Sequence, residues 1–359
     1  MTVFRKLRLN AVFLGISALL MGSGAAAFDP ITIVDQQSFA AGGKVETAPG
    51  TFEANRPTEA GQSIHGDHAY FFCQKPADAK PLAMTFLHGA MQFSKTWETT
   101  PDGREGFQTI FLRKGWQTCV VDQPRRGNAG RALADAEIKA AKNDQTLFGM
   151  FRLGLWPKFY DGVAFKQDAA VLDQFFRQVT PNIGPFDAEI AAAGVAAGLE
   201  KTGPTVLVTH SQGGGVGWLI AMQNSNVRAV VAYEPGSGFV FPKGEAPETM
   251  SSSFEPLSAD EVPLETFKKL TRIPIVVYYG DNIPRSPSPI PNADQWRVRV
   301  DMARLWVDAV NRHGGDAQLV MLPDVGIKGN THFPFSDLNN QEVAEQLSQW
   351  LHAKHLDRS

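Results

Sequence analysis

Short apolar runs alternate with longer amphipathic stretches along most of the chain. The apolar runs are rich in Val, Ile and aromatic residues, a pattern typical of buried strands. The amphipathic stretches include 294–312 and 340–354, which we expect to be helices. Strands that alternate with helices predict an α/β fold, in which helices cover both faces of a mostly parallel sheet. The expected strands are 66–73, 82–87, 116–121, 205–208, 227–233, 273–279 and 317–322.

Other stretches depart from this alternation. Residues 28–65 are rich in Gly, Ala, Thr and Pro and predict an early strand or two with loops. Between 94 and 114 a helix is expected, and from 129 to 203 the chain is expected to be mostly helical. An aromatic-rich insert at 148–160 interrupts that region, and both ordinary core and a cap over a pocket account for it. The Ser-, Pro- and Gly-rich excursion at 236–271 suits a second lid segment.

The first 27 residues have the pattern of a cleavable signal peptide. A basic start precedes an apolar run at 11–21, and three alanines then offer a cleavage site. The apolar run is too short to span a bilayer comfortably, so we expect no stable membrane anchor and export to the periplasm or the medium. The predicted organisation is a signal peptide at 1–27 and a single domain at 28–359, with cap segments near 129–165 and 236–271.

Charge and cysteine content narrow the class of protein. A net charge of -3 over 359 residues gives no electrostatic support for a nucleic-acid partner. The two cysteines, Cys73 and Cys119, lie on strands expected to be neighbours, which favours a disulfide in an oxidising compartment over two buried free thiols. A structural zinc site usually takes four ligands, and no Cys-x-x-Cys spacing is present, so no metal is expected.

The strand at 205–208 leads into Thr-His-Ser-Gln-Gly, with Ser211 at its centre and an apolar helix after it. A sharp strand-to-helix turn pushes one side chain out at the top of a sheet, and small residues two positions away let the turn close. This is the mechanics of the nucleophile elbow, G-x-S-x-G. Here Thr209 replaces the leading Gly, while glycines follow from 213 to 215. The pattern predicts Ser211 as a nucleophile.

A serine hydroxyl needs a base to take its proton, and the base is usually a histidine oriented by a carboxylate. In elbow-type hydrolases the chain order is Ser, acid, His. Of the later histidines, His332 is the one expected in a loop between the last strand and the last helix. Asp281 and Glu234 both end strands that follow the elbow, and a carboxylate there is costly to desolvate without a partner. The residues alone leave the two acids as alternatives.

An oxyanion hole requires backbone N–H groups aimed at the developing negative charge. One is expected from Gln212, which follows the nucleophile. The other is expected from the loop after His88-Gly89, at Ala90, with Met91 next to it. Apolar residues near these groups are expected to shape a pocket. The candidate pocket residues are Met91, His210, Phe151, Trp156 and Phe239.

Taken together, these motifs resemble those of the α/β-hydrolase superfamily from about residue 70 to the final helix. The matching pieces are His88-Gly89, Asp122-Gln-Pro-Arg-Arg-Gly127, His210-Ser-Gln-Gly213, Tyr279-Gly-Asp281 and Asn330-Thr-His-Phe333. Within the superfamily, Tyr-Glu-Pro-Gly at 233–236 is similar to secreted bacterial carboxylesterases whose acid is a Glu. This resemblance implies Glu234 as the acid and Asp281 as a strand cap. It also implies that Asp122 and Arg126 are structural or pocket-edge residues.

The sequence therefore predicts an exported, cofactor-free serine hydrolase that cleaves small-molecule carboxylic esters through an acyl-enzyme. One alternative keeps the fold but acts on a lactone, amide, C–C or polyester bond, because the pocket and not the triad selects the bond. Another is a non-catalytic periplasmic binding module on the same scaffold. The sequence does not determine whether the protein is a monomer or a homodimer.

Overall fold

The computed structural model describes residues 29–358, and residues 32–358 form one compact unit. The predicted signal peptide lies outside the described residues. In this part of the chain, every helix is too short or too polar to cross a bilayer.

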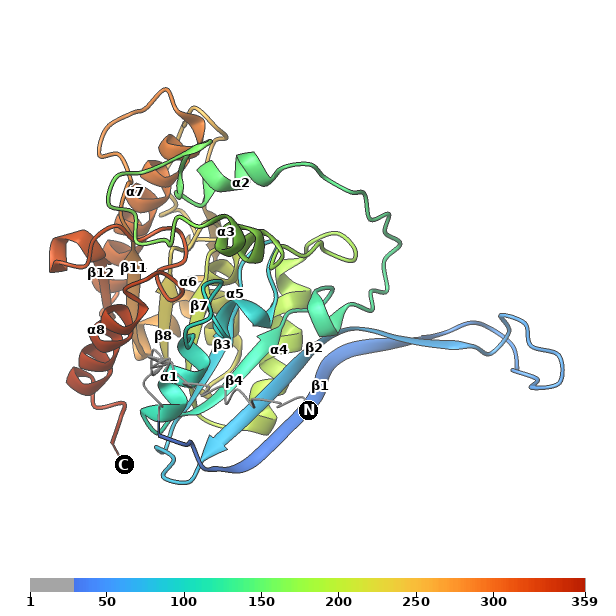
Figure 1. Ribbon diagram of the computed structural model, residues 1–359. Coiled ribbons are helices and arrows are strands. Elements are labelled where there is room, and N and C mark those ends of the chain that lie inside the picture. The colour runs from blue at the N-terminus through green and yellow to red at the C-terminus, as the bar shows by residue number, and fades with distance from the viewer. Residues whose placement is uncertain (1–28, 359) are drawn as a thin grey trace, which may run out of the picture. The chain divides into compact units, whose positions relative to one another are not determined.

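An eight-stranded sheet organises the unit, in the order β1-β2-β4-β3-β7-β8-β11-β12 (Figure 1). The strands from β4 to β12 in that order are parallel, whereas β2 pairs antiparallel with both β4 and β1. The predicted α/β class with a mostly parallel sheet is confirmed. The strands are β1 (Ile33–Thr47), β2 (Ser63–Pro76), β3 (Ala83–Leu87), β4 (Gln117–Asp122), β7 (Thr205–His210), β8 (Val227–Tyr233), β11 (Pro274–Tyr279) and β12 (Asp316–Met321).

Successive side chains of the central strands pack alternately into two separate hydrophobic cores, one on each face of the sheet. Leu207, next in sequence to Val208, packs with the first core, and Val208 packs with the second. This is the two-residue period of a strand covered on both faces. The first core is closed by α4 (Ala188–Thr202), α5 (Gln212–Gln223) and α7 (Pro291–Arg312). The second is closed chiefly by α1 (Phe107–Arg113) and α8 (Asn340–Ala353).

The region from 129 to 203 is less helical than the sequence predicts. Residues 131–143 have no regular structure, and the expectation of helix there is wrong. The segment has helix-forming alanines but almost no apolar face to bury; Ile138 is 54% exposed. A short helix without such packing is marginal in water. The elements that follow are α2 (Asp144–Met150), β5 (Gly154–Leu155), β6 (Lys158–Phe159) and α3 (Ala169–Phe176).

The helix expected at 94–114 is also interrupted. A 3-10 turn, η1 (Ser94–Trp97), is separated from α1 by a loop that folds back on itself. A side chain on Gly106 would overlap the carbonyl of Glu98, so the glycine permits this close approach. The second excursion, 236–271, contains short elements only: β9 (Val240–Pro242), β10 (Asp260–Val262) and α6 (Leu264–Phe267).

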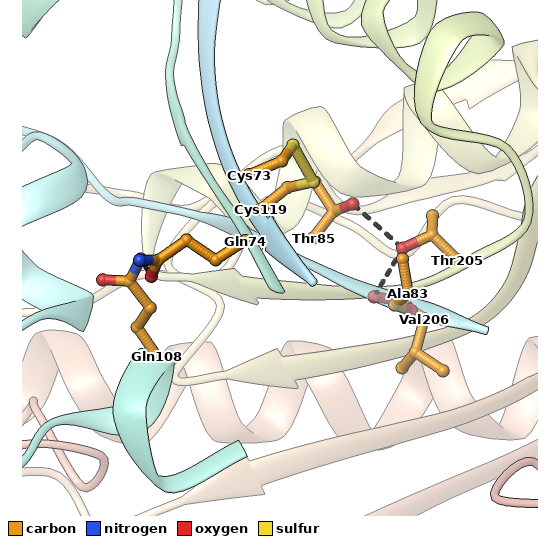
Figure 2. The surroundings of a disulfide bond; sticks show 8 residues. All are labelled: Cys73, Gln74, Ala83, Thr85, Gln108, Cys119, Thr205 and Val206. Atoms are coloured by element: carbon orange, nitrogen blue, oxygen red, sulfur yellow. Dashed lines mark hydrogen bonds between the residues drawn. A yellow bond between two sulfur atoms is a disulfide. The ribbon is translucent and has the colours of Figure 1, made fainter. Parts of the chain in front are cut away.

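A disulfide joins Cys73 on β2 to Cys119 on β4, where the two residues lie directly opposite each other (Figure 2). Their Cα atoms are 4.1 Å apart, and both side chains are buried in the core beneath α4. Next to it, the Thr205 hydroxyl bonds to the Thr85 hydroxyl at 2.9 Å and links β7 to β3. The cross-link therefore fixes the antiparallel strands to the parallel part of the sheet.

Replacing both cysteines by alanine is expected to lower the free energy of unfolding. The bridge closes a separation of 46 residues, for which the chain-entropy model gives roughly 4 kcal/mol. Urea unfolding of the oxidised protein, the reduced protein and the Cys73→Ala/Cys119→Ala variant measures this. The reduced protein is the control and is expected to resemble the variant. Equal midpoints for the oxidised and reduced proteins would contradict the prediction.

Candidate active site

Ser211 occupies a sharp turn between β7 and α5. Its backbone is at φ 54° and ψ −122°, a left-handed region that ordinary residues avoid. The turn is held on both sides: the Ser211 amide donates to the carbonyl of Tyr233 at 3.0 Å, and its carbonyl accepts from the Gly214 amide at 2.9 Å. The side chain is half-buried and therefore reachable from solvent. This is the geometry of a nucleophile elbow.

The threonine that replaces the leading elbow glycine is accommodated from the other side of the turn. A Cβ on Gly217 of α5 would lie 2.7 Å from the Thr209 methyl group, which is closer than carbon atoms approach. The missing side chain at Gly217 thus leaves room for Thr209. On the facing loop, a Cβ on Gly89 would lie 2.7 Å from Cβ of Ser211, so glycine is also needed there. The elbow therefore keeps its shape because Gly217 and Gly89, rather than a glycine at 209, provide the space it needs.

Glu234 meets His332 beside this turn. Glu234 follows β8 directly, and His332 lies in the loop between β12 and α8. His332 Nδ1 is 3.2 Å from Glu234 Oε2, and both side chains are at most 1% exposed. Nδ1–H donates to the carboxylate, which leaves Nε2 as a proton acceptor. Among residues 29–358, no hydrogen bond joins Ser211 Oγ to this ring; in unliganded hydrolases that bond often tightens only with substrate bound.

Asp281 is occupied elsewhere. Its two carboxylate oxygens accept from the backbone amides of Asn282 at 2.8 Å and Gly329 at 2.9 Å. It fixes the chain after β11 to the start of the histidine loop. The structure therefore brings Glu234, and not Asp281, into contact with His332.

Sequence reasoning missed Arg152, which is fully buried against Glu234. Its guanidinium donates to both carboxylate oxygens, at 2.8 and 2.6 Å. It also donates to the backbone carbonyls of Asp281 at 2.9 Å and Thr331 at 3.2 Å. The available signal was a single cation inside the apolar run 147–156, since a buried charge requires a partner. The aromatic insert thus contacts the candidate site through Arg152, its one charged residue before Lys158.

Aromatic rings surround the His332 imidazole. Phe151 stacks on it at 5.6 Å between centroids, and Trp296 of α7 lies 4.2 Å away. The guanidinium groups of Arg152 and Arg299 lie over the Trp296 ring at 4.9 and 5.2 Å. Burial, followed by the charges of these two arginines, holds the pKa of His332 well below its usual value. The ring is therefore neutral at neutral pH and able to accept a proton.

The loop that carries His332 is braced from several sides. His210 Nε2 donates to the His332 carbonyl at 2.7 Å, and the His332 amide donates to the carbonyl of Phe151 at 2.9 Å. Asp337 accepts from the amide and hydroxyl of Thr331 at 2.7 and 2.8 Å, and burial raises the pKa of Asp337 to about 7. His210, expected to line a pocket, is instead fully buried and supports the loop.

The expected oxyanion loop faces the elbow. Gln212 opens α5, so its amide has no carbonyl within its own helix to bond. Ala90 is half-buried, and Met91 has φ 56°. The loop is held by buried Arg126, which donates to the carbonyls of Gly89 at 3.1 Å and Gln92 at 3.0 Å.

A small apolar pocket, with a free volume of only about 10 Å³, lies beside the histidine loop. Phe151, one of the predicted pocket residues, lines it. Trp156 is about half exposed and packs on Phe148, while Phe239 is fully buried and packs on Trp306. Within residues 29–358, neither ring contacts His332 or His210. The pocket is lined by Gln92, Thr96, Phe151, Phe175, Gln178, Val179, Phe333 and Ser336.

No group of three or more His, Cys, Asp or Glu side chains in the described part of the chain is placed to hold a metal ion. Beside the Ser211 turn lie the His332–Glu234 pair and the backbone of the loop at Gly89. Such an arrangement activates a hydroxyl for attack on a carbonyl group.

Comparisons with known proteins agree with this fold. The chain matches no family model. It is 26% identical over 312 residues to a protein named "Probable secreted lipase phiG" (Fungal sp., strain ATCC 74256), covering 76% of this chain and 82% of that protein. A solved structure described as a novel bacterial esterase is 28% identical, with a TM-score of 0.72, and the match covers 91% of this chain and 98% of the other. The chain has the α/β-hydrolase fold, and the resemblance to that superfamily is confirmed.

The His332 imidazole is expected to titrate below 6.5, its usual pKa, because burial and two nearby cations disfavour its charged form. Histidine-labelled NMR across pH measures this, with the resonance assigned by a His332→Asn variant. Arg299→Gln removes one cation and is expected to raise the pKa. Arg304→Gln removes an exposed arginine of the same helix and is expected to leave it unchanged. A pKa of 6.5 or above in the unmodified protein would contradict this reading of the site.

Proposed function

We propose that the protein is a serine hydrolase that cleaves carboxylic esters through an acyl-enzyme. The observation that carries the proposal is the combination of Ser211 on a strained elbow with a buried His332–Glu234 pair beside it. The bond class is supported by the names of the two similar proteins, a lipase and an esterase. No cofactor takes part in the proposed reaction.

In the first half of the reaction, Ser211 Oγ attacks the ester carbonyl while His332 Nε2 takes the hydroxyl proton. The carbonyl π electrons move to oxygen, and the resulting oxyanion accepts hydrogen bonds from the amides of Gln212 and Ala90. When the intermediate collapses, the C–O bond to the alcohol breaks. His332 gives its proton to the departing alkoxide, which leaves as the alcohol, and the acyl group stays on Ser211.

In the second half, a water molecule repeats the sequence. His332 takes a proton from the water as its oxygen attacks the acyl carbon, and the same two amides hold the oxyanion. The bond to Ser211 Oγ then breaks, His332 returns the proton to Ser211, and the carboxylic acid leaves. Glu234 keeps Nδ1 protonated throughout, so that Nε2 is always the nitrogen that accepts and returns the proton.

Arg152 acts in this scheme as a positioning residue. It occupies both oxygens of Glu234, and the amide of Gly280 donates to Oε1 at 2.5 Å. With these donors in place the carboxylate has a single orientation toward His332. The positive charge of Arg152 also lowers the pKa of His332 and so favours the base form. The arginine therefore fixes the orientation of Glu234 and keeps His332 in its neutral form, without touching the substrate.

The small apolar pocket lined by Phe151, Phe175 and Phe333 offers its surface, rather than a ready cavity, to a hydrocarbon part of the substrate. Its walls contact the histidine loop, and Phe151 stacks on the His332 ring. Small apolar groups of an acyl chain or an alcohol gain free energy on transfer to such a surface. We propose further that residues 1–27 direct export to the periplasm or the medium, as the word "secreted" in the name of the similar lipase supports.

Ser211→Ala is the direct test of this function. Removing the nucleophile is expected to lower turnover of a short p-nitrophenyl ester by roughly 10⁴-fold or more. A serine-reactive phosphonate is expected to label the folded parent protein at Ser211 and to leave the variant unlabelled. Activity retained in Ser211→Ala would overturn the mechanism. Absence of both labelling and hydrolysis in the folded parent protein would favour a binding module.

Glu234→Gln and Asp281→Asn form a matched pair that identifies the acid. Glu234→Gln is expected to reduce kcat by roughly 10² to 10⁴-fold, because the amide no longer fixes the imidazole tautomer. Asp281→Asn keeps one acceptor oxygen for the histidine loop and is expected to keep kcat within about tenfold, with at most roughly 1–3 kcal/mol lost in stability. Steady-state kinetics and urea unfolding of both variants measure this. A collapse confined to Asp281→Asn would assign the acid to Asp281.

The bond class is tested by a substrate panel. Hydrolysis of p-nitrophenyl esters of increasing chain length is measured beside lactones, amides and a polyester film. Preference for short or medium esters supports the proposal, since the pocket selects the bond. A higher kcat/KM for a lactone or an amide would identify the protein as a lactone or amide hydrolase. The proposed roles of Ser211, His332 and Glu234 would be unchanged.

A further inference from the structure

We propose that Arg299 forms an anion-binding subsite beside Ser211, which selects esters that carry a carboxylate a few carbons from the bond to be cleaved. The inference deepens the proposed function and rests on it. It names the substrate class that the triad by itself leaves open.

Arg299 is a cation without a counter-ion next to the candidate nucleophile. It lies on α7 and is half-buried, and its guanidinium makes one hydrogen bond, from Nη1 to the carbonyl of Gln295 at 2.8 Å. Across residues 29–358 it forms no ion pair with a carboxylate, whereas Arg297 on the same helix pairs with Asp294 at 2.7 Å. Burial without a partner disfavours the charged form and lowers the pKa of Arg299. An anionic ligand would supply the missing partner.

Gly236 gives the distance between this cation and the nucleophile. A Cβ built on Gly236 would lie 3.6 Å from Ser211 Oγ and 3.7 Å from Arg299 Nε. One carbon-sized space therefore touches both groups at ordinary contact distance. Gly236 is not among the residues with a left-handed backbone, so its conformation does not itself require glycine. The absence of a side chain there means that Gly236 itself does not fill this space.

The guanidinium is held in one orientation. It lies over the Trp296 ring, 5.2 Å from the centroid, and the guanidinium of Arg152 lies over the same ring. Arg152 is fully used by Glu234, so Arg299 is the arginine of this pair with donors to spare. Two acidic groups act on Arg299: the buried Tyr279 phenol, and Glu255, which is exposed and forms no ion pair with it. An arginine of fixed orientation binds a carboxylate through two parallel hydrogen bonds.

The substrate class follows from this spacing. The carbonyl carbon must sit next to Ser211 Oγ, and a carboxylate must reach the guanidinium across the gap beside Gly236. A chain of a few carbons spans that gap, as in a monoester of a short dicarboxylic acid. An ester whose alcohol part bears the carboxylate offers the same chemistry from the other side of the bond.

The experiment compares charged esters with uncharged isosteres of the same shape. Monoethyl glutarate is paired with its amide analogue, ethyl 4-carbamoylbutanoate, to test the acyl side. Butyryloxyacetate is paired with butyryloxyacetamide to test the alcohol side. Hydrolysis is followed by pH-stat at pH 8.5, where His332 is neutral in every variant, so that changes in its pKa do not affect the rates.

The readout is the ratio of kcat/KM for the charged ester to that for its amide. A hydrogen-bonded charge is expected to make this ratio roughly ten to a hundred in one of the two pairs. Arg299→Gln is expected to bring the ratio close to one, and Arg299→Lys to retain part of it. Gly236→Ala, which fills the space between the two groups, is expected to lower the ratio as well. Arg304→Gln removes an exposed arginine of the same helix and is the control, expected to keep the parent ratio.

A ratio near one for both pairs in the parent protein would overturn the proposal. A ratio that survives Arg299→Gln, or that falls equally in Arg304→Gln, would also overturn it, because the preference would then come from the overall charge of the protein. These results are distinguishable from failure of the proposed function. In that case the parent protein would hydrolyse neither the charged esters nor the neutral p-nitrophenyl esters.

Discussion

The buried ion pair between Arg152 and Glu234 is the interaction on which the candidate site depends. Arg152 comes from the aromatic insert, and its four hydrogen bonds reach the end of β8, the end of β11 and the histidine loop at once. Burying two charges is costly, and their mutual attraction offsets that cost only when the geometry is good and the remaining donors are satisfied. Here the guanidinium bonds both carboxylate oxygens, and its two further hydrogen bonds go to backbone carbonyls. The insert is therefore part of the site, and the three sheet-edge segments are held in one arrangement.

Backbone strain is concentrated around the same residues. Ser211, Glu234, Arg152 and Met91 all have positive φ values between 54° and 58°. Each such residue costs on the order of 1–3 kcal/mol and persists only where the surroundings determine its conformation. The hydrogen bond from the Ser211 amide to Tyr233, the residue before Glu234, links two of the strained turns. The packing of the sheet offsets the conformational free energy that these strained turns cost. The turns at its carboxyl edge in return orient their side chains toward the candidate site.

Much of this arrangement could be predicted from the sequence, because local patterns encode it. The alternating apolar runs gave the sheet, and the Ser, acid, His order gave candidates whose side chains do meet, at Glu234 and His332. The choice of Glu234 over Asp281 required the resemblance to a family, since both carboxylates end parallel strands. Only the three-dimensional structure shows that Asp281 is already saturated by two backbone amides.

The remaining features could not be predicted because they depend on contacts between distant segments. Arg152 and Glu234 are 82 residues apart, and nothing local identifies them as partners. The room for Thr209 likewise comes from Gly217, on the far side of the turn. The segment 131–143 was misjudged for the opposite reason: its local helix preference was clear, but no apolar surface was available to stabilise the helix.

The balance of charge links this architecture to chemistry. Glu234 is neutralised by Arg152, so Arg299 leaves the site with a positive surplus before substrate binds. That surplus disfavours the imidazolium form of His332 and keeps the base ready. In the proposed mechanism it would also favour the oxyanion next to Ser211, since opposite charges attract more strongly away from water. A substrate carboxylate would cancel the surplus on binding and raise the basicity of His332 in the complex. In the proposed reaction, an arginine placed in this way would couple the recognition of a charged ester to the proton transfer that cleaves it.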